Sequence, residues 1–366
     1  MTNTLAQGLA TSQNERVEVT LVTQTPGDGM DDTSLPFRVV RQPGAWKLFV
    51  MIKASSVAHV ANPAFLPMLF AWLLRKPFVV EHDGYQAACP NGLLLCGKDR
   101  RVCPGHFMAG QYLQCLRCNS SELGPFGSLR LFALSFPRRW LAQRATRNVA
   151  PSRHVGNRVS LPKTQVIYHG VPEVDAALHL SSAVAHSCPV CFAFVGRLVA
   201  EKGVSVLLLA SRELLRRGHA FRVKIFGDGP ERARLEEMAR SLGLGCAEFV
   251  GAVPMESLPP QLSGVTAIVI PSVWEDVAPL VAAEQLMLGN LVIASDIGGL
   301  GEIVDGYGMT FPAGDADALA ACMEFAITNP EAVKKLRQRA REHALAVHTE
   351  DRMVADHATL YRSVAR

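Results

Sequence analysis

The sequence predicts an α/β protein built from two doubly wound domains. Its 366 residues are too many for one compact core and fit two domains of ordinary size. In the second half, short runs rich in β-branched and aromatic residues alternate with segments that keep the helical spacing of apolar side chains. Such alternation is typical of a parallel sheet covered by helices.

Five runs after residue 190 are predicted to be strands, because each is apolar and bounded by Gly, Pro or Asp. They are "CFAFVGRL", "FRVKIFG", "CAEFVG", "TAIVIPS" and "LVIASD". Helices are expected over Val204–Leu215 and Leu235–Leu242, where apolar residues recur every three or four positions.

The first half follows the same pattern less regularly. Four runs, "VEVTLVTQT", "FRVVRQ", "VAHVAN" and "PFVVEHD", are predicted strands, and residues 64–75 and 128–147 are predicted helices. The small, polar segment "LSSAVAHSCP" at 180–189 is the expected linker.

These patterns divide the chain into three parts. Residues 1–180 form one domain with a cysteine-rich insert at 89–118, and residues 181–345 form the other. Residues 346–366 are expected to form a helix that crosses back to the first domain. Two such domains facing each other make a cleft lined by the carboxyl ends of strands, where ligands bind.

Composition excludes several classes of protein. With 49% hydrophobic and 19% charged residues the chain is globular, and no secretory leader opens it. The most apolar window, "AFLPMLFAWLL", has 11 residues and a proline, too short to span a bilayer. A cytoplasmic protein is therefore expected.

Basic residues are concentrated in the first half. Residues 100–163 hold eleven Arg and Lys against one acid, Glu122. This is either a solvated face or a surface attracted to anions, such as the inner face of a membrane or a phosphorylated substrate. No nucleic-acid-binding motif accompanies the charge, so nucleic acid is not an expected partner.

The stretch "FVGRLVAEKG" favours phosphate binding. Gly196 follows a predicted strand and lets a ligand approach, while Arg197 and Lys202 flank the start of a helix, whose N-terminus favours anions. Arg offers a planar fork and Lys a point charge, a combination that suits a diphosphate. The alternative is a pair of surface cations on a loop.

The stretch "PSVWEDVAPLVAAEQLMLG" places two carboxylates eight positions apart, Asp276 and Glu284. Glu284 interrupts an apolar helix face, and a buried carboxylate needs hydrogen-bond donors. Sugar hydroxyls are such donors. Nearby backbone or an arginine would satisfy the carboxylate equally well.

Taken together, the motifs resemble those of a known family. "GRLVAEKG", "IFGDGPERARLE", "FVGAV", "PSVWEDVAPLVAAE", "ASDIGGLGEIV" and "PAGDADALA" occur in the order and spacing of retaining glycosyltransferases of family four, which have the GT-B fold. The resemblance is strong over about 190–330 and weaker over 15–175, where "HVANP", "VVEHDGY", "VAPSRHV" and "VIYHGV" look like the acceptor half.

The resemblance implies a nucleotide-sugar site in the second domain. Its expected residues are Gly196, Arg197, Lys202, Pro271, Ser272, Leu280, Val281 and Glu284. Arg197 and Lys202 would hold the donor's pyrophosphate, and Glu284 its ribose hydroxyls. Pro271 and Ser272 would lie near the base.

Two residues are expected to act on the donor sugar, His82 of the first domain and Asp276 of the second. Fixed cations and a helix N-terminus would stabilise the leaving diphosphate without a metal. The chain's Asp-x-Asp, Asp315 and Asp317, reads as a helix N-cap rather than a metal clamp.

The sequence departs from the family pattern in two places. The family's first acid is usually Glu, where this chain has Asp276. The family's opening strand and glycine-rich loop are not recognised, since "LAQGLATSQNERVEVTLVT" already resembles the helix and second strand that follow them.

Five cysteines gather in the insert, at positions 89, 96, 103, 115 and 118. Cys96, Cys103, Cys115 and Cys118 have metal-ligand spacing and suit a structural zinc, or less readily an iron–sulfur cluster. A disulfide or unligated thiols are the alternatives. Cys188 and Cys191 are read as incidental.

The predicted function is transfer of a hexose from a UDP-, GDP- or ADP-sugar to a glycan or lipid-linked acceptor, with retention at the sugar carbon. The alternative is a catalytically weak GT-B protein that acts as a partner subunit. A dinucleotide oxidoreductase is disfavoured, since no G-x-G-x-x-G follows a predicted strand.

Overall fold

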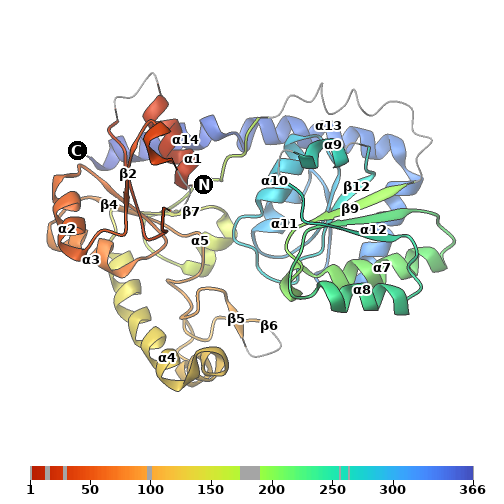
Figure 1. The fold of residues 1–366 in the computed structure, drawn as a ribbon, viewed down its shortest axis with the longest axis horizontal. Coiled ribbons are helices and arrows are strands. Elements are labelled where there is room, and N and C mark those ends of the chain that lie inside the picture. The colour runs from red at the N-terminus through yellow and green to blue at the C-terminus, as the bar shows by residue number, and fades with distance from the viewer. Residues whose placement is uncertain are drawn as a thin grey trace. The chain divides into compact units, whose positions relative to one another are not determined.

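The computed structural model describes residues 2–12, 17–27, 31–96, 101–173, 190–254, 257–262 and 264–365. They form two compact units (Figure 1). The first comprises residues 1–170 and 349–366, and the second comprises residues 171–348. The predicted linker at 180–189 lies outside the described residues.

The second unit is built on a six-stranded parallel sheet with the order β11-β10-β9-β12-β13-β14. The strands are β9 (Cys191–Val195), β10 (Arg222–Phe226), β11 (Ala247–Gly251), β12 (Ala267–Ile270), β13 (Val292–Ser295) and β14 (Met309–Phe311). The five predicted strands are confirmed. The sixth, β14, is three residues long and was not predicted.

Helices cover both faces of this sheet (Figure 1). One face carries α7 (Val204–Arg216), α8 (Arg232–Ser241) and α12 (Ala316–Thr328), and the other carries α9 (Leu258–Leu262), α10 (Leu280–Met287), α11 (Gly298–Val304) and α13 (Pro330–Val347). Alternate residues of β9 face opposite cores, Phe192 and Phe194 one and Cys191 and Ala193 the other. Because both faces are buried, the strands read as continuous apolar runs.

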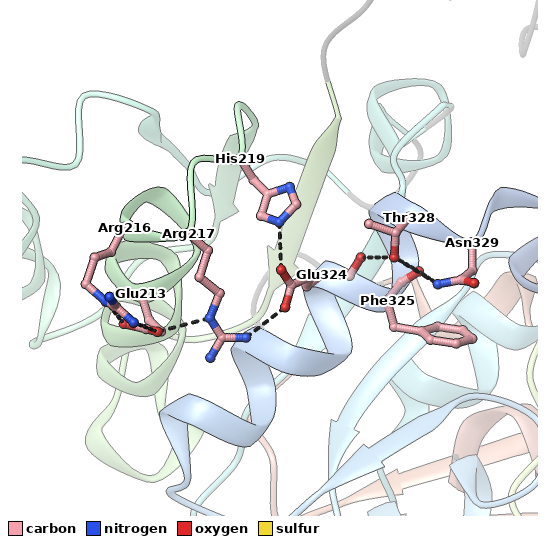
Figure 2. A network of polar contacts seen from close by, with 8 residues as sticks. All are labelled: Glu213, Arg216, Arg217, His219, Glu324, Phe325, Thr328 and Asn329. Carbon is pink, nitrogen blue, oxygen red and sulfur yellow. Dashed lines mark hydrogen bonds and ion pairs between the residues drawn. The ribbon is translucent and has the colours of Figure 1, made fainter.

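A polar network ties the end of α7 to α12 (Figure 2). Glu324 of α12 lies 2.8 Å from Arg217 and 2.8 Å from His219. Arg217 also lies 3.0 Å from Glu213, whose second partner is Arg216. The hydrogen bonds from Arg216 and Arg217 lower the pKa of Glu213 to about 2. The network therefore keeps its carboxylates charged at neutral pH.

The first unit contains a four-stranded parallel sheet, β3-β4-β7-β8, and a separate parallel pair, β1-β2. The strands are β1 (Thr20–Thr23), β2 (Arg38–Arg41), β3 (Ala58–Ala61), β4 (Phe78–Glu81), β7 (Arg147–Ala150) and β8 (Thr164–Val166). The four predicted strands are confirmed as β1 to β4. In a doubly wound sheet, one more strand would lie between β1 and β3. The described strands instead form two separate sheets on either side of that position, β1-β2 and β3-β4-β7-β8.

The remaining elements of the first unit are mostly helical. They are α1 (Thr2–Thr11), the short 3-10 helix η1 (Asp32–Ser34), α2 (Ala45–Ala54), α3 (Phe65–Leu73), α4 (Tyr112–Gln143), α5 (Arg153–Val159), α14 (Glu350–Val364) and the two-residue strands β5 (Leu95–Cys96) and β6 (Arg101–Val102). The helix predicted over 128–147 is part of α4, but it ends at Gln143, and Arg147 begins β7. No helix in the described ranges is long and apolar enough to cross a bilayer.

The C-terminal helix α14 packs into the first unit, against α1 and the sheet. Leu5 and Leu9 of α1 share a buried cluster with Met353 and Leu360 of α14 and with Val79 of β4. Thr349 caps α14 by accepting a hydrogen bond from the backbone N–H of Arg352.

A buried carboxylate joins α14 to β3 and β4. The Glu81 side chain is nearly inaccessible and lies 3.0 Å from Nε2 of His59, 3.5 Å from His169 and 3.8 Å from His357. Tyr361 of α14 lies 2.7 Å from the other ring nitrogen of His59. Burial alone would raise the pKa of Glu81, but His169 and His59 outweigh it and hold the pKa well below its ordinary value.

The first prediction concerns Gly203, which has a φ of 66° and lies against the loop that follows β12. An added Cβ would lie 1.9 Å from the carbonyl oxygen of Pro271. Gly203→Ala should lower the free energy of unfolding of the second unit by about 2–4 kcal/mol through strain and overlap. Gly218→Ala is the matched control, because Gly218 has a φ of 89° with no atom within 4 Å of an added Cβ. It should cost only about 1–2 kcal/mol. Equal losses in urea unfolding would contradict the close contact.

The second prediction concerns pH and His169. Burial opposes its charge, but Asp83 and Glu81 prevail and raise the pKa of His169 to about 9 from 6.5. Its stabilising contribution is therefore complete below pH 6.5 and lost as the pH rises towards 9. His82 and His357 have pKa values lowered by burial, so their effects fall below that window.

Native-state hydrogen exchange of β4 amides at pH 6 and pH 8.5 measures the effect. The wild type should lose on the order of 1–3 kcal/mol of protection free energy over this range. His169→Gln should be less stable at pH 6 and should lose little more by pH 8.5. Parallel pH profiles for the two proteins would show that His169 is uncharged in the fold.

Candidate functional site

The second unit changes winding direction between β9 and β12. These two strands pair directly, although the end of β9 at Val195 and the start of β12 at Ala267 are far apart in sequence. From β9 the chain proceeds to β10 and β11 on one side, and β12 begins the other side. The loops after β9 and β12 therefore leave the same sheet edge side by side. The backbone N–H of Val273 donates to the carbonyl of Glu201 at 2.9 Å, which joins the two loops. Ligands of doubly wound sheets bind at such a point.

Two predicted site residues meet between these loops. Lys202, in the 3-10 turn η2 (Ala200–Lys202), donates a hydrogen bond from Nζ to Oδ2 of Asp276. Asp276 is nearly buried, and its backbone carbonyl accepts from the N–H of Gly299 on α11 at 2.9 Å. The ammonium keeps further N–H donors for a second acceptor.

Arg197 follows β9 and is exposed. Within the described part of the chain, its guanidinium has no recorded hydrogen bond or ion pair. An exposed guanidinium five residues before Lys202 gives the loop after β9 an available positive charge.

The start of α10 offers further groups that lack partners. Its N-cap residue, Pro279, makes no side-chain capping bond. The N–H of Leu280 donates to the carbonyl of Ala278 at 2.8 Å, whereas the N–H of Val281 receives no side-chain acceptor there. Glu284 is half-buried, and burial raises the pKa of its carboxyl group. No described residue forms a recorded hydrogen bond or ion pair with that carboxylate.

Ser272 follows β12 after the buried Pro271. Its side chain is fully buried, and its hydroxyl oxygen has no hydrogen-bond partner. Most buried polar atoms in proteins have such a partner, so an unpaired one is typical of a functional position.

Two glycines at this point were not predicted as site residues. Gly203 contacts the Pro271 carbonyl as described. Gly298 has a φ of 64°, and a Cβ added to it would lie only 2.7 Å from Cα of Glu275, which is too close. Both allow backbone segments to approach each other. The sequence signal was present in "EKG" and "IGG", since glycine at a helix start often marks a close approach.

In the first unit, His82 lies directly after β4 and is completely buried. Its Nε2 lies 2.9 Å from Oδ1 of Asn148, and its backbone N–H donates to Val149 at 2.9 Å. Its Nδ1 has no partner. Burial lowers the pKa of His82, so the ring is neutral at pH 7.

Asp83 and His169 extend this polar group and were not predicted as site residues. Nε2 of His169 lies 3.1 Å from Oδ1 of Asp83. The two atoms are close enough for an ion pair, but their alignment does not meet the geometry of a hydrogen bond. The motifs "EHDGY" and "VIYHGV" contain both residues, but sequence reasoning singled out His82 alone.

Among the residues that the structure describes, two groups of side chains have spacings compatible with a metal ion. One is Glu81, Asp83 and His169, whose charges are already paired with one another. The other is Cys96, Cys103 and His106, in the insert.

No disulfide joins the described cysteines, so the disulfide alternative is not realised among them. Cys188 lies outside the described residues, and Cys191 is a buried thiol in β9. Asp315 caps α12 by accepting from the N–H of Ala318 at 2.9 Å, which confirms the predicted N-cap.

Comparison with known proteins agrees with the site in the second unit. Residues 181–343 match the model of the family described as glycosyl transferases group 1. An alpha-D-kanosaminyltransferase of Streptomyces kanamyceticus is 32% identical over 154 residues, which are 41% of this chain and 39% of that protein. The chain thus spans about two fifths of that relative's length.

A longer match reaches into the first unit. The amylovoran biosynthesis glycosyltransferase AmsK of Erwinia amylovora is 29% identical over 300 residues, 78% of this chain and 69% of that protein.

Solved structures share the fold of the whole chain. HepE of Anabaena, in complex with UDP and glucose, has a TM-score of 0.71 at 16% identity, with 98% of this chain and 95% of that one covered. Sucrose-phosphate synthase from Thermosynechococcus elongatus has a TM-score of 0.68 at 21% identity, with 98% and 91% covered. The fold is accordingly GT-B, and most of the second unit matches the model of the group 1 glycosyl transferases.

Proposed function

We propose that this protein is a retaining glycosyltransferase that moves a hexose from a nucleoside diphosphate sugar to a glycan or lipid-linked acceptor. The observation that carries the proposal is the meeting of Lys202 and Asp276 where β9 and β12 diverge. The same loop carries the exposed Arg197, and the segment after Asp276 leads to the start of α10, which has no side-chain cap. HepE, a structural neighbour, is described as binding UDP and UDP-glucose, which supports a donor of this kind.

The proposed roles follow from the charge that develops during transfer. As the bond from the sugar carbon to the diphosphate oxygen breaks, the diphosphate keeps the electron pair and gains negative charge. In this proposal Arg197, Lys202 and the N–H of Val281 stabilise that charge. The acceptor oxygen then bonds to the sugar carbon, and its proton passes to the departing diphosphate.

Glu284 and Ser272 are assigned to the nucleoside. An unpaired, half-buried carboxylate gains stability when hydroxyl groups donate to it, and a ribose presents two such groups side by side. In this assignment Ser272 lies near the base. Both residues would then confer affinity rather than rate.

His82 and Asp276 are assigned to the donor sugar. The neutral His82 ring can steady positive charge at the reacting carbon or orient a hydroxyl through its unpartnered Nδ1. Asp276 holds Lys202 in place and can accept from a sugar hydroxyl. A partner subunit would need none of these groups, so turnover separates it from an enzyme.

The third prediction tests the donor site. Arg197→Ala and Lys202→Ala should each weaken binding of the preferred nucleoside diphosphate by about 1.5–3 kcal/mol, typical of a charge-assisted contact. Thermal shifts with UDP, GDP and ADP first identify the base. Titration calorimetry then measures the variants.

His82→Ala provides the comparison for this test. It should keep nucleotide affinity and lose turnover by at least about a hundredfold, since its proposed contact is made to the sugar. Unchanged affinity in both cation variants would refute the donor site. Wild-type turnover in His82→Ala would remove its catalytic assignment.

We further propose that the first unit contacts an anionic membrane surface on the cytoplasmic side, where a lipid-linked acceptor is presented. Large apolar side chains are exposed on α2, α3 and α4, including Trp46 at 76% and Phe126 at 87%. Exposed arginines on or just after α4, at positions 117, 130 and 144, accompany them. Apolar residues with flanking cations are typical of interfacial binding.

The fourth prediction is measured by sedimentation with vesicles. The protein should bind vesicles containing phosphatidylglycerol and bind neutral phosphatidylcholine vesicles weakly. Phe126→Glu should reduce binding by at least about tenfold, because burial of one Phe contributes about 1.5–3 kcal/mol. Phe325→Glu, at a residue 42% exposed in the second unit, is the control and should bind like wild type. Equal binding to both vesicle types would refute the proposal.

A further inference from the structure

The cysteine-rich insert between β4 and α4 has little secondary structure of its own. Its two strands, β5 and β6, are two residues long and pair antiparallel, with Cys96 opposite Arg101. The backbone N–H of Cys103 donates to the carbonyl of Leu94 at 2.6 Å, which continues the hairpin by one residue. A hairpin this short does not stabilise itself, so another interaction must hold the insert.

The hairpin brings potential metal ligands together. The thiol sulfurs of Cys96 and Cys103 and one ring nitrogen of His106 all lie within 4.8 Å of one another. The sulfur of Cys103 lies 3.6 Å from Nδ1 of His106. These residues are close in space although they belong to a loop with little regular secondary structure.

The distances match a zinc tetrahedron. With Zn–S bonds of about 2.3 Å and Zn–N bonds of about 2.0–2.1 Å, neighbouring ligand atoms in a tetrahedral site lie about 3.5–3.8 Å apart. The Cys103–His106 separation already has this value. The other pairs need to close by about 1 Å or less, within the reach of a thiol rotation.

The first turns of α4 bring a further thiol to the hairpin. Cys118 lies against it, with its sulfur 3.3 Å from the carbonyl of Leu95, the residue before Cys96. Cys118 lies outside the group whose ligand atoms are all within 4.8 Å, so it would have to move towards the other three to bind the same ion.

The other two cysteines of the insert are more enclosed. Cys115 is buried, and burial, followed by the charges of Cys89 and Cys103, raises its pKa to about 12. Cys89 is also buried, and its thiol donates to Oδ1 of Asn91 at 3.0 Å. Both are suited to remain protonated thiols within the packed insert.

We propose that Cys96, Cys103, His106 and Cys118 bind a zinc ion that fixes the insert to α4. Each thiol releases its proton on binding, and the ion takes four protein ligands, which is typical of a structural site. Compared with the set expected from the sequence, His106 takes the place of Cys115. The carbonyl of Cys103 accepts from Arg158 of α5 at 2.6 Å, so the ion would also anchor the hairpin towards α5.

The test is the metal content of the full chain, purified under reducing conditions without chelator. Mass spectrometry of the wild type should give about one equivalent of zinc. Replacement of zinc by cobalt should give the intense visible bands of a tetrahedral thiolate site. Less than about a tenth of an equivalent in folded wild-type protein would overturn the proposal.

Variants identify the ligands. Cys103→Ser, His106→Ala and Cys118→Ser should each reduce bound zinc at least fivefold. Cys115→Ser should retain it, and so should the second-unit control Cys246→Ser. His106→Cys should restore binding, because four thiolates also suit zinc.

Some variants could fail through misfolding, so circular dichroism accompanies each metal measurement. Zinc retained by folded Cys103→Ser or His106→Ala would refute the site. Zinc lost from Cys115→Ser and kept by Cys118→Ser would refute the assignment of the fourth ligand. The wild-type metal content decides the central question regardless of how the variants fold.

Discussion

The second unit depends on one constraint: the chain winds in opposite directions from two adjacent parallel strands, β9 and β12. Because β9 and β12 are neighbours, the loops that follow them must share the same sheet edge. Their backbones approach so closely that Gly203 cannot carry a side chain. The same approach brings Lys202 and Asp276 into contact from positions 74 residues apart. The close approach of the two loops therefore determines both how they pack and where their charged groups lie.

Each unit contains a carboxylate that is at least half-buried, and the two carboxylates differ in their partners. In the first unit, Glu81 is enclosed by histidines, so its charge is paired internally and stabilises the fold. In the second unit, Glu284 keeps its carboxylate without a recorded partner in the described chain, and burial disfavours its charge. Paired charges confer rigidity, whereas unpaired ones gain most from a ligand. This contrast supports the proposed nucleotide site in the second unit.

Sequence patterns predicted the fold well where side chains are uniformly apolar. The runs of the second unit were recognised because both sheet faces are buried. In the first unit, β7 was missed because Asn148 interrupts it, and its side chain is held by His82 and by the carbonyls of Ala142 and Pro162. The candidate site residues were each chosen through the family resemblance, and they stay predictions. The Lys202–Asp276 contact and the approach of His106 to Cys103 depend on loop geometry, which no periodicity encodes.

The chain order of the first unit has a consequence for biosynthesis. Tyr361 contacts His59 across 302 residues of sequence, and α14 completes the core beneath α1. The second unit, by contrast, is continuous in sequence over 171–348. During translation, the later unit can therefore finish folding first, while the earlier one waits with its buried-acid cluster open. Residues 349–366 must leave the ribosome before the first unit reaches its final form.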